Sequence, residues 1–158
     1  MTVNPKTVTG RRDLTFHSLD DVLADVEQLA ASANVRTLGN WSFDRLLSHL
    51  AMTFRGSVDG FQSKAPLWIR LILPVFKKRV ISHPLRPGIR LPASVEVQAY
   101  PTANSLSSAL EDFRRSIQRA RTERMEKPHP AFGRMTHEEW LQLHLRHCEM
   151  HLSFVVVR

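Results

Sequence analysis

Residues 136–152 read THEEWLQLHLRHCEMHL, and the rest of the chain is interpreted from this stretch. It begins with a capping box, in which Thr136 is the N-cap and Glu139 follows three residues later. Apolar residues then recur at helical spacing as far as Phe154. The stretch therefore predicts a helix from Thr136 to about Phe154, with one apolar face turned toward a core.

Three histidines, His144, His147 and His151, lie on the apolar face of this predicted helix. His147 and His151 are one turn apart, so their Cβ atoms are expected about 5–6 Å from each other and both rings can reach one metal ion. A third ligand must be added to this pair. His49 is the best candidate, because it lies beside the apolar face of another predicted helix, and His144 is the alternative.

The competing interpretation is that these histidines are hydrogen-bonded core residues without a metal. If they do bind a metal, three neutral imidazoles leave a divalent ion with its full charge and an open coordination position. Such a site suits activation of water or Lewis-acid chemistry better than a closed structural role. Zinc, nickel and iron all accept imidazole ligands, so the identity of the metal stays open.

For the remaining candidate residues we expect structural roles or none. Cys148 is expected to be a small buried hydrophobe, and Arg146 to form a salt bridge. His129 is expected in a turn, where it can pack near the site. Trp140 is expected in the core, and surface or loop positions without a role are expected for His17, His83 and His137.

Helical periodicity outside this stretch predicts three more helices of similar length. They begin near Ser18, cover Ser42 to about Gly60, and cover Ser105–Met125. Gly56 and Gly60 should each weaken the second of these by ~1 kcal/mol relative to alanine. No run of alternating apolar residues predicts a sheet-based fold. The fold class is therefore all-α, a four-helix bundle with a long irregular crossover between its second and third helices.

The length of 158 residues fits a single domain, 1–158, with residues 1–16 as a loose lead-in. One cysteine cannot form an internal disulfide, and the first residues contain no apolar stretch typical of a secretory signal. Leu71–Phe76, the longest strongly apolar run, is interrupted by Pro74 and is too short to span a bilayer. We therefore expect a cytoplasmic protein.

The net charge is +7, and residues 64–90 contain seven basic residues and no acidic one. We call residues 64–90 the basic-apolar segment, because Trp68, Leu71, Phe76 and Val80 alternate there with the cations. A helix over Leu67–Val80, interrupted at Pro74, is possible here. The segment could bind an anionic membrane or a protein partner, or it could pack over the mouth of the bundle, which is the interpretation we favour. No nucleic-acid motif is present.

The sequence also resembles a known superfamily. Residues 129–140, HPAFGRMTHEEW, followed by LHLRH at 143–147 and His151-Leu152, resemble the C-terminal signature of the DinB-like superfamily, in a branch labelled as a domain of unknown function. Asn40-Trp41-Ser42, with His49 in the following helix, resembles the second-helix segment of that superfamily. The resemblance extends from about Arg11 to Phe154.

This resemblance implies an up-down-down-up helical bundle, and the metal triad of the superfamily falls on His49, His147 and His151. His144 then becomes a neighbour of the ligands, or an alternative ligand. Met150 stands where the superfamily often has a further histidine, which changes the lining of the pocket.

The functional expectation follows from the site and the resemblance together. Relatives include thiol transferases that use mycothiol or bacillithiol, maleylpyruvate isomerases and metal hydrolases. We expect a metal-dependent enzyme, of hydrolase or thiol-transferase type, that activates water or a small thiol toward a small-molecule substrate. The alternatives are a non-catalytic binding module that uses residues 64–90, and an inactive scaffold. A homodimer is a further possible assembly, and no nucleic-acid partner is expected.

Overall fold

The computed structural model describes residues 2–88 and 105–157. Within these residues the chain is mainly helical, as predicted, and a small two-stranded sheet accompanies the helices. The helices are α1 (Leu19–Ala31), α2 (Phe43–Asp59), α3 (Leu67–Ser82), α5 (Leu106–Thr122) and α6 (His137–Leu152), and the strands are β1 (Val35–Thr37) and β2 (Val155–Val157).

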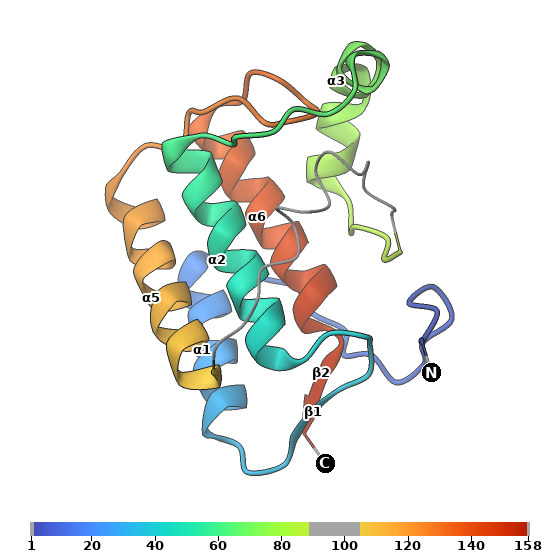
Figure 1. Ribbon diagram of the computed structural model, residues 1–158, viewed down its shortest axis with the longest axis vertical. Coiled ribbons are helices and arrows are strands. Elements are labelled where there is room, and N and C mark those ends of the chain that lie inside the picture. Colours follow the sequence, from blue (N-terminus) through green and yellow to red (C-terminus); the bar gives the residue numbers. More distant parts are fainter. Residues whose placement is uncertain (1, 89–104, 158) are drawn as a thin grey trace.

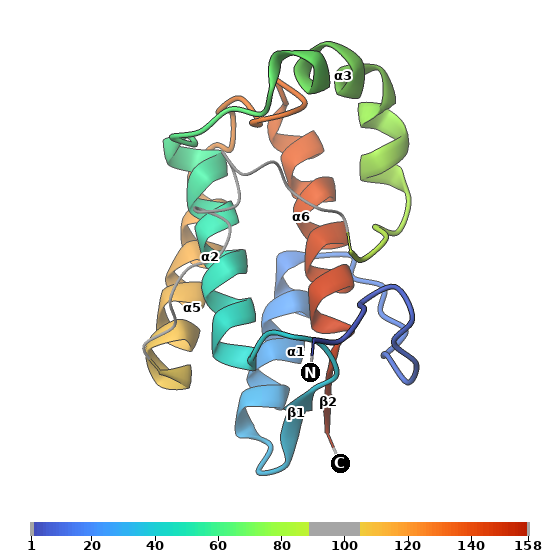
Figure 2. The ribbon, with the colours of Figure 1, turned by 45° about the vertical axis from the view of Figure 1, so that its right-hand side comes forward.

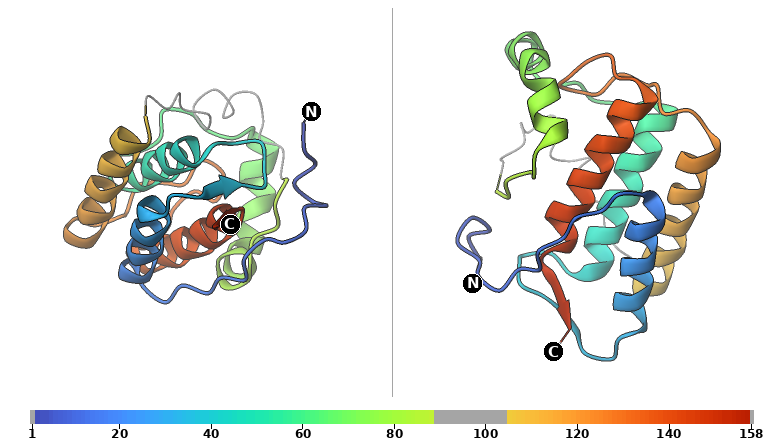
Figure 3. Two further views of the ribbon diagram at one scale, coloured as in Figure 1. Left: turned by 90° about the horizontal axis from the view of Figure 1, so that it is seen from below. Right: turned by 180° about the vertical axis from the view of Figure 1, so that it is seen from behind.

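Four of these helices, α1, α2, α5 and α6, lie side by side along the longest axis of the molecule (Figure 1). α1 and α6 run in one direction, and α2 and α5 run in the other. α2 packs against α5 and α6, and α1 packs against the same two helices. α3 lies outside this group and contacts α6, as the end-on view of Figure 3 also shows.

The starts of α1, α5 and α6 follow from local side-chain chemistry. Ser18, Ser42, Ser105 and Thr136 are the N-caps, at the starts that the sequence predicts, and all of them except Ser42 accept a side-chain hydrogen bond from a backbone N–H of the first turn. Ser18 and Thr136 each form a complete capping box with the carboxylate three residues later. These bonds satisfy backbone N–H groups that have no partner inside the helix, which fixes where α1 and α6 begin.

The two strands were not predicted from the sequence. β1 pairs with β2 in antiparallel register, Val35 opposite Val157 and Thr37 opposite Val155. Leu38 N–H donates to Phe154 O at 2.8 Å just beyond this pairing. The sheet therefore holds the end of the chain against the connection between α1 and α2.

Residues 2–18, the described part of the segment before α1, contain no helix or strand, yet their second half is held in place by hydrogen bonds. Arg12 N–H donates to Ser153 O at 2.9 Å, and Phe16 N–H donates to a carboxylate oxygen of Glu149 at 2.7 Å. Arg146 forms the expected salt bridge, with Glu149 at 2.9 Å, and also donates to Phe16 O. The buried carboxylate of Glu149 thus has both a cation and a backbone donor, and it ties the lead-in to α6.

The connection between α2 and α5 is not irregular throughout, because α3 occupies its first part. α3 continues through Pro74, where the sequence predicted an interruption, and Figure 2 shows that the helix changes direction partway along its length. Proline removes one backbone N–H and crowds the preceding turn, which bends a helix without necessarily ending it. Arg90 and the prolines at 92 and 101 lie outside the described residues. No helix in the described part of the chain is both long and apolar enough to cross a membrane.

Gly56 lies in α2 directly beneath the ring of Phe61. A Cβ atom added at Gly56 would come within 2.3 Å of that ring, much closer than two carbon atoms can approach. Glycine is therefore required here by packing, although it lowers helix propensity. Phe61 stacks in turn on Trp140 of α6, with ring centroids 5.9 Å apart, so this close approach links α2 to α6.

We predict that Gly56→Ala destabilises the protein. The gain in helix propensity is at most ~1 kcal/mol, whereas forcing extra atoms into a packed interior typically costs about 1–3 kcal/mol. Urea denaturation followed by circular dichroism measures the difference. In a Phe61→Leu background the same change should lose most of its cost, because the ring is gone. A Gly56→Ala protein more stable than the wild type would contradict this prediction.

Candidate metal centre

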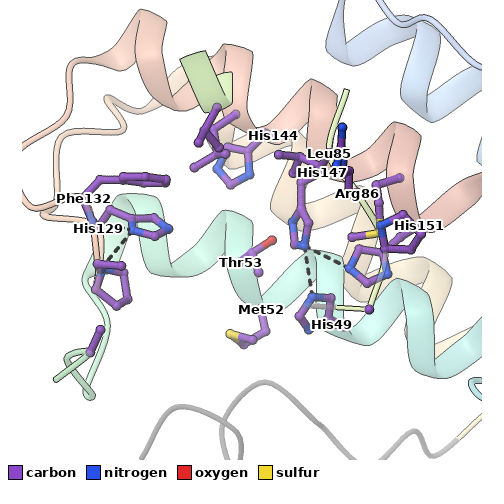
Figure 4. Close-up of a pocket in the computed structure, with 18 of the residues that line it drawn as sticks. His49, Met52, Thr53, Leu85, Arg86, His129, Phe132, His144, His147 and His151 are labelled. Carbon is purple, nitrogen blue, oxygen red and sulfur yellow. Dashed lines mark hydrogen bonds between the residues drawn. The ribbon is translucent and has the colours of Figure 1, made fainter. Parts of the chain in front are cut away.

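The site lies between α2 and α6, which run side by side in opposite directions (Figure 1). α2 contributes His49, and α6 contributes His147 and His151 from consecutive turns. The three rings point toward one another (Figure 4). His147 Nε2 lies 3.3 Å from His49 Nε2 and 3.0 Å from His151 Nε2, and one ligand nitrogen from each ring falls within 4.8 Å of the others.

These separations fit the coordination sphere of a divalent metal. For zinc–nitrogen bonds of 2.0–2.1 Å, two ligands of a tetrahedral site lie about 3.3 Å apart. Two of the three nitrogen pairs are close to that separation. Without an ion, each Nε2 is either a donor or an acceptor, so His147 cannot satisfy both neighbours equally. An ion between the rings would use three lone pairs at once.

The protonation states also suit metal binding. Burial lowers the pKa of His147 well below its ordinary value, and repulsion from His151 and His49 lowers it further. The pKa of His151 is lowered in the same way, by burial and then by His49 and the guanidinium of Arg11. Both rings are therefore neutral near pH 7, which is the form that coordinates a metal.

Trp41 forms a wall of the site. Its indole stacks on His151, with ring centroids 5.6 Å apart and planes 9° apart, and it meets the edge of His49 at 5.1 Å. The guanidinium of Arg45 lies 5.3 Å from the centre of the Trp41 ring. In the sequence, Trp41 entered only through the family resemblance. An aromatic residue directly before the helix that carries His49 was the feature that could have indicated its role.

His144 lies one turn before His147, but its side chain belongs to a different environment. Its Nε2 is 3.0 Å from Ser57 Oγ, and the Ser57 hydroxyl donates to Phe54 O at 2.7 Å. Because that hydroxyl has a single proton, His144 Nε2–H must be the donor to Ser57. The ring is also stacked between Phe54 and Trp140. The structure therefore brings His49, and not His144, to the His147–His151 pair.

The three histidines open into a cavity of about 670 Å³ between α2, α6 and α3. The triad lies at one end, together with Leu85 and Arg86, and His129 and Phe132 lie at the other end (Figure 4). Sequence reasoning did not identify Arg86 as a site residue, because its position depends on how the segment after α3 folds back.

The other histidines divide between the cavity and its surroundings. His129 lines the cavity as expected, and its Nδ1 accepts from the N–H groups of Ala131 and Phe132 at 3.0 and 3.1 Å. His83 bonds to Arg79 O, His137 accepts from Met125 N–H, and neither lines the cavity. Cys148 is fully buried, as predicted, and burial raises the pKa of its thiol, so it is unreactive.

We predict that the metal-free protein loses stability as the pH falls from about 6.5 toward 4. Burial lowers the pKa of His144 to about 3 and of His129 to about 4, from an ordinary value of 6.5. In this window the unfolded chain binds more protons than the folded chain, so acidification favours unfolding. Urea denaturation at several pH values measures the slope.

The matched variant for this prediction is His144→Phe, which keeps an aromatic ring between Phe54 and Trp140. His144→Phe removes one group that takes up a proton on unfolding. The dependence of the unfolding free energy on pH should therefore become shallower by up to about 1.4 kcal/mol per pH unit. The exposed residue His17 provides the control, as His17→Gln. An unchanged slope in the His144→Phe protein would show that His144 is not held neutral by burial.

The chain was compared with protein families, curated proteins and solved structures. A family described as "Protein of unknown function (DUF1569)" matches residues 8–158. No curated protein and no solved structure gave a significant match. The matched region includes α1, α2, α3, α5 and α6 and all three converging histidines. The chain therefore belongs to the DUF1569 family of proteins of unknown function.

Proposed function

We propose that this protein is a metal-dependent enzyme in which His49, His147 and His151 hold one divalent ion. The observation that carries the proposal is the convergence of three ring nitrogens at the end of a large cavity. His49 is buried and His147 and His151 are half-buried, so little water reaches these rings, and leaving their converging nitrogens without a ligand would be costly. A bound ion would remove that cost, and zinc, nickel and iron all accept three imidazoles.

A relationship to the DinB-like superfamily is part of this proposal. The directions of α1, α2, α5 and α6 are those of an up-down-down-up four-helix bundle, which is the topology of that superfamily. The ligand set transferred from the superfamily is also the set that the structure brings together. This agreement supports a reaction of hydrolase or thiol-transferase type, by analogy with the characterised relatives.

The chemistry would divide between the ion and the residues of this chain. A divalent ion with three neutral ligands lowers the pKa of a bound water or thiol, so that the nucleophile forms near pH 7. Trp41 keeps His151 and His49 in position through its stacking and edge contacts. His144, held by Ser57, fixes the neighbouring turn of α6 against α2. The mainly apolar lining of the cavity would limit the amount of water around the reacting groups.

We predict that purified, untagged protein binds about one equivalent of a divalent metal. His49→Ala, His147→Ala and His151→Ala should each weaken zinc binding at least tenfold, because each removes one of three ligands. Elemental analysis after dialysis and competition with a zinc indicator measure this. His17→Gln, at an exposed histidine outside the cavity, is the control and should bind metal normally. Full metal retention in the His147→Ala protein would exclude the triad.

The same variants separate the two reaction classes. A chromogenic ester tests hydrolysis, and 1-chloro-2,4-dinitrobenzene with a small thiol tests transfer of the thiol sulfur to carbon. Metal-loaded wild-type protein should accelerate one of these reactions, and the His147→Ala protein should accelerate neither. Rates that do not depend on the loaded ion would contradict an enzymatic role for the site.

A second candidate function rests on the outer face of α3. Six large apolar side chains are exposed there, including Leu71 at 69% and Val75 at 79%. Cations accompany them, and residues 60–88 contain six basic residues and no acidic one. One of these, Lys77, is paired with Glu139 of α6. An exposed apolar row with basic neighbours is typical of a helix that lies on an anionic membrane surface.

We predict that the protein sediments with phosphatidylglycerol vesicles at low salt and much less with phosphatidylcholine vesicles. The double variant Leu71→Asp/Val75→Asp should lose this binding, because it places charges in the apolar row. Val157→Asp, an exposed apolar position on β2, is the control. No sedimentation at low salt would exclude the membrane, and a dimer that the double variant dissociates would assign the face to a second copy.

A further inference from the structure

The cavity beside the triad has two chemically different ends. Its volume of about 670 Å³ lies within the range of pockets that enclose a small organic molecule. The three converging histidines occupy one end, and an aromatic group occupies the other (Figure 4). A ligand that fills this space must therefore satisfy two different environments.

The end remote from the triad is apolar. Phe61 and Trp140 stack there with ring centroids 5.9 Å apart, and His129 and Phe132 pack with centroids 4.6 Å apart. The ring of His129 adds no charge, because burial lowers its pKa to about 4. α3 adds aliphatic side chains such as Leu73 to the lining of the cavity. A ligand rich in hydroxyl groups would leave them without partners against these walls, at a large cost.

The triad end is polar and carries positive charge. Arg86 lies there beside His147 and His151 (Figure 4), and it is the only Arg, Lys, Asp or Glu among the described residues that line the cavity. No salt bridge to Arg86 is present within residues 2–88 and 105–157. An anionic group placed beside the triad would therefore meet a guanidinium that carries no other counter-charge in the described chain.

We propose that this cavity binds an amphipathic molecule, with an anionic headgroup at Arg86 and the three histidines and an apolar body on the aromatic end. The inference rests on the proposed function only for the headgroup, since the apolar body would bind with or without a metal. It narrows the substrate class from any small molecule to one with a long apolar portion. A carboxylate with an alkyl chain, such as dodecanoate, has this chemistry.

The chain contains its own probe for this binding. All three tryptophans, Trp41, Trp68 and Trp140, line the cavity. Intrinsic fluorescence should therefore change in a saturable way when octanoate, decanoate or dodecanoate is added below its micellar concentration. The affinity should rise about three- to fourfold for each added methylene group, as expected for burial of an alkyl chain. Dodecyltrimethylammonium, with the same tail and a cationic head, should bind at least tenfold more weakly than dodecanoate.

Two variants test the two ends of the cavity separately. Arg86→Gln should weaken dodecanoate binding about five- to tenfold and remove the preference over the cationic amphiphile. Arg70→Gln, at an exposed cation of α3 outside the lining, should bind like the wild type. Thr53→Phe should abolish binding by filling the middle of the cavity (Figure 4). Because Arg86 is exposed, its replacement should leave the fold intact even if Thr53→Phe does not.

The outcomes distinguish this inference from the proposed function. No saturable fluorescence change, equal binding of both amphiphiles, or unaltered binding by Arg86→Gln would overturn the amphipathic ligand. Elemental analysis of the same samples reports the metal independently. A protein that holds one equivalent of metal and binds no amphiphile contradicts this inference alone, and a protein that binds dodecanoate but never a metal contradicts the proposed function alone.

Discussion

Three imidazoles meeting between two antiparallel helices are the constraint on which this structure depends. Their Nε2 atoms approach to 3.0 and 3.3 Å, and burial keeps His147 and His151 uncharged by lowering their pKa. Such a group tolerates little sliding of α2 along α6, because one turn of a helix is about 5.4 Å long. The bond between His144 and Ser57 joins the same two helices one turn away and holds that register.

The surrounding elements fix the two helices that carry the histidines. α6 begins at a complete capping box, and its last turn is held by hydrogen bonds from Arg12 and Phe16 of the lead-in. β2 follows immediately and pairs with β1, which leads to Trp41 and then to α2. The short sheet thus brings the start of α2 close to the end of α6, where Trp41 contacts the rings of both helices.

The sequence predicts those features of the fold and the site that depend on residues close together in the chain. The capping box at the start of α6 and the His147–His151 pair follow from spacings of three and four residues. The choice of His49 over His144 required the family resemblance, because spacing cannot place two helices relative to each other. Three-residue strands are too short to show alternation, and the position of Arg86 depends on contacts distant in sequence. Gly56 was interpreted through helix propensity alone, although the ring of Phe61 decides its role.

The two proposed binding surfaces meet at α3. Trp68 and Ile72 belong to its exposed apolar row, at 65% and 53% exposure, and both also line the cavity that leads to the triad. The mouth of the cavity and the exposed row are therefore continuous. A helix that rests on a lipid surface would place this mouth against the lipids, where an amphipathic molecule is concentrated. If the ligand entered past α3, its apolar body would move from the lipids directly into the apolar cavity. Little of its apolar surface would then be exposed to water on the way to the histidines.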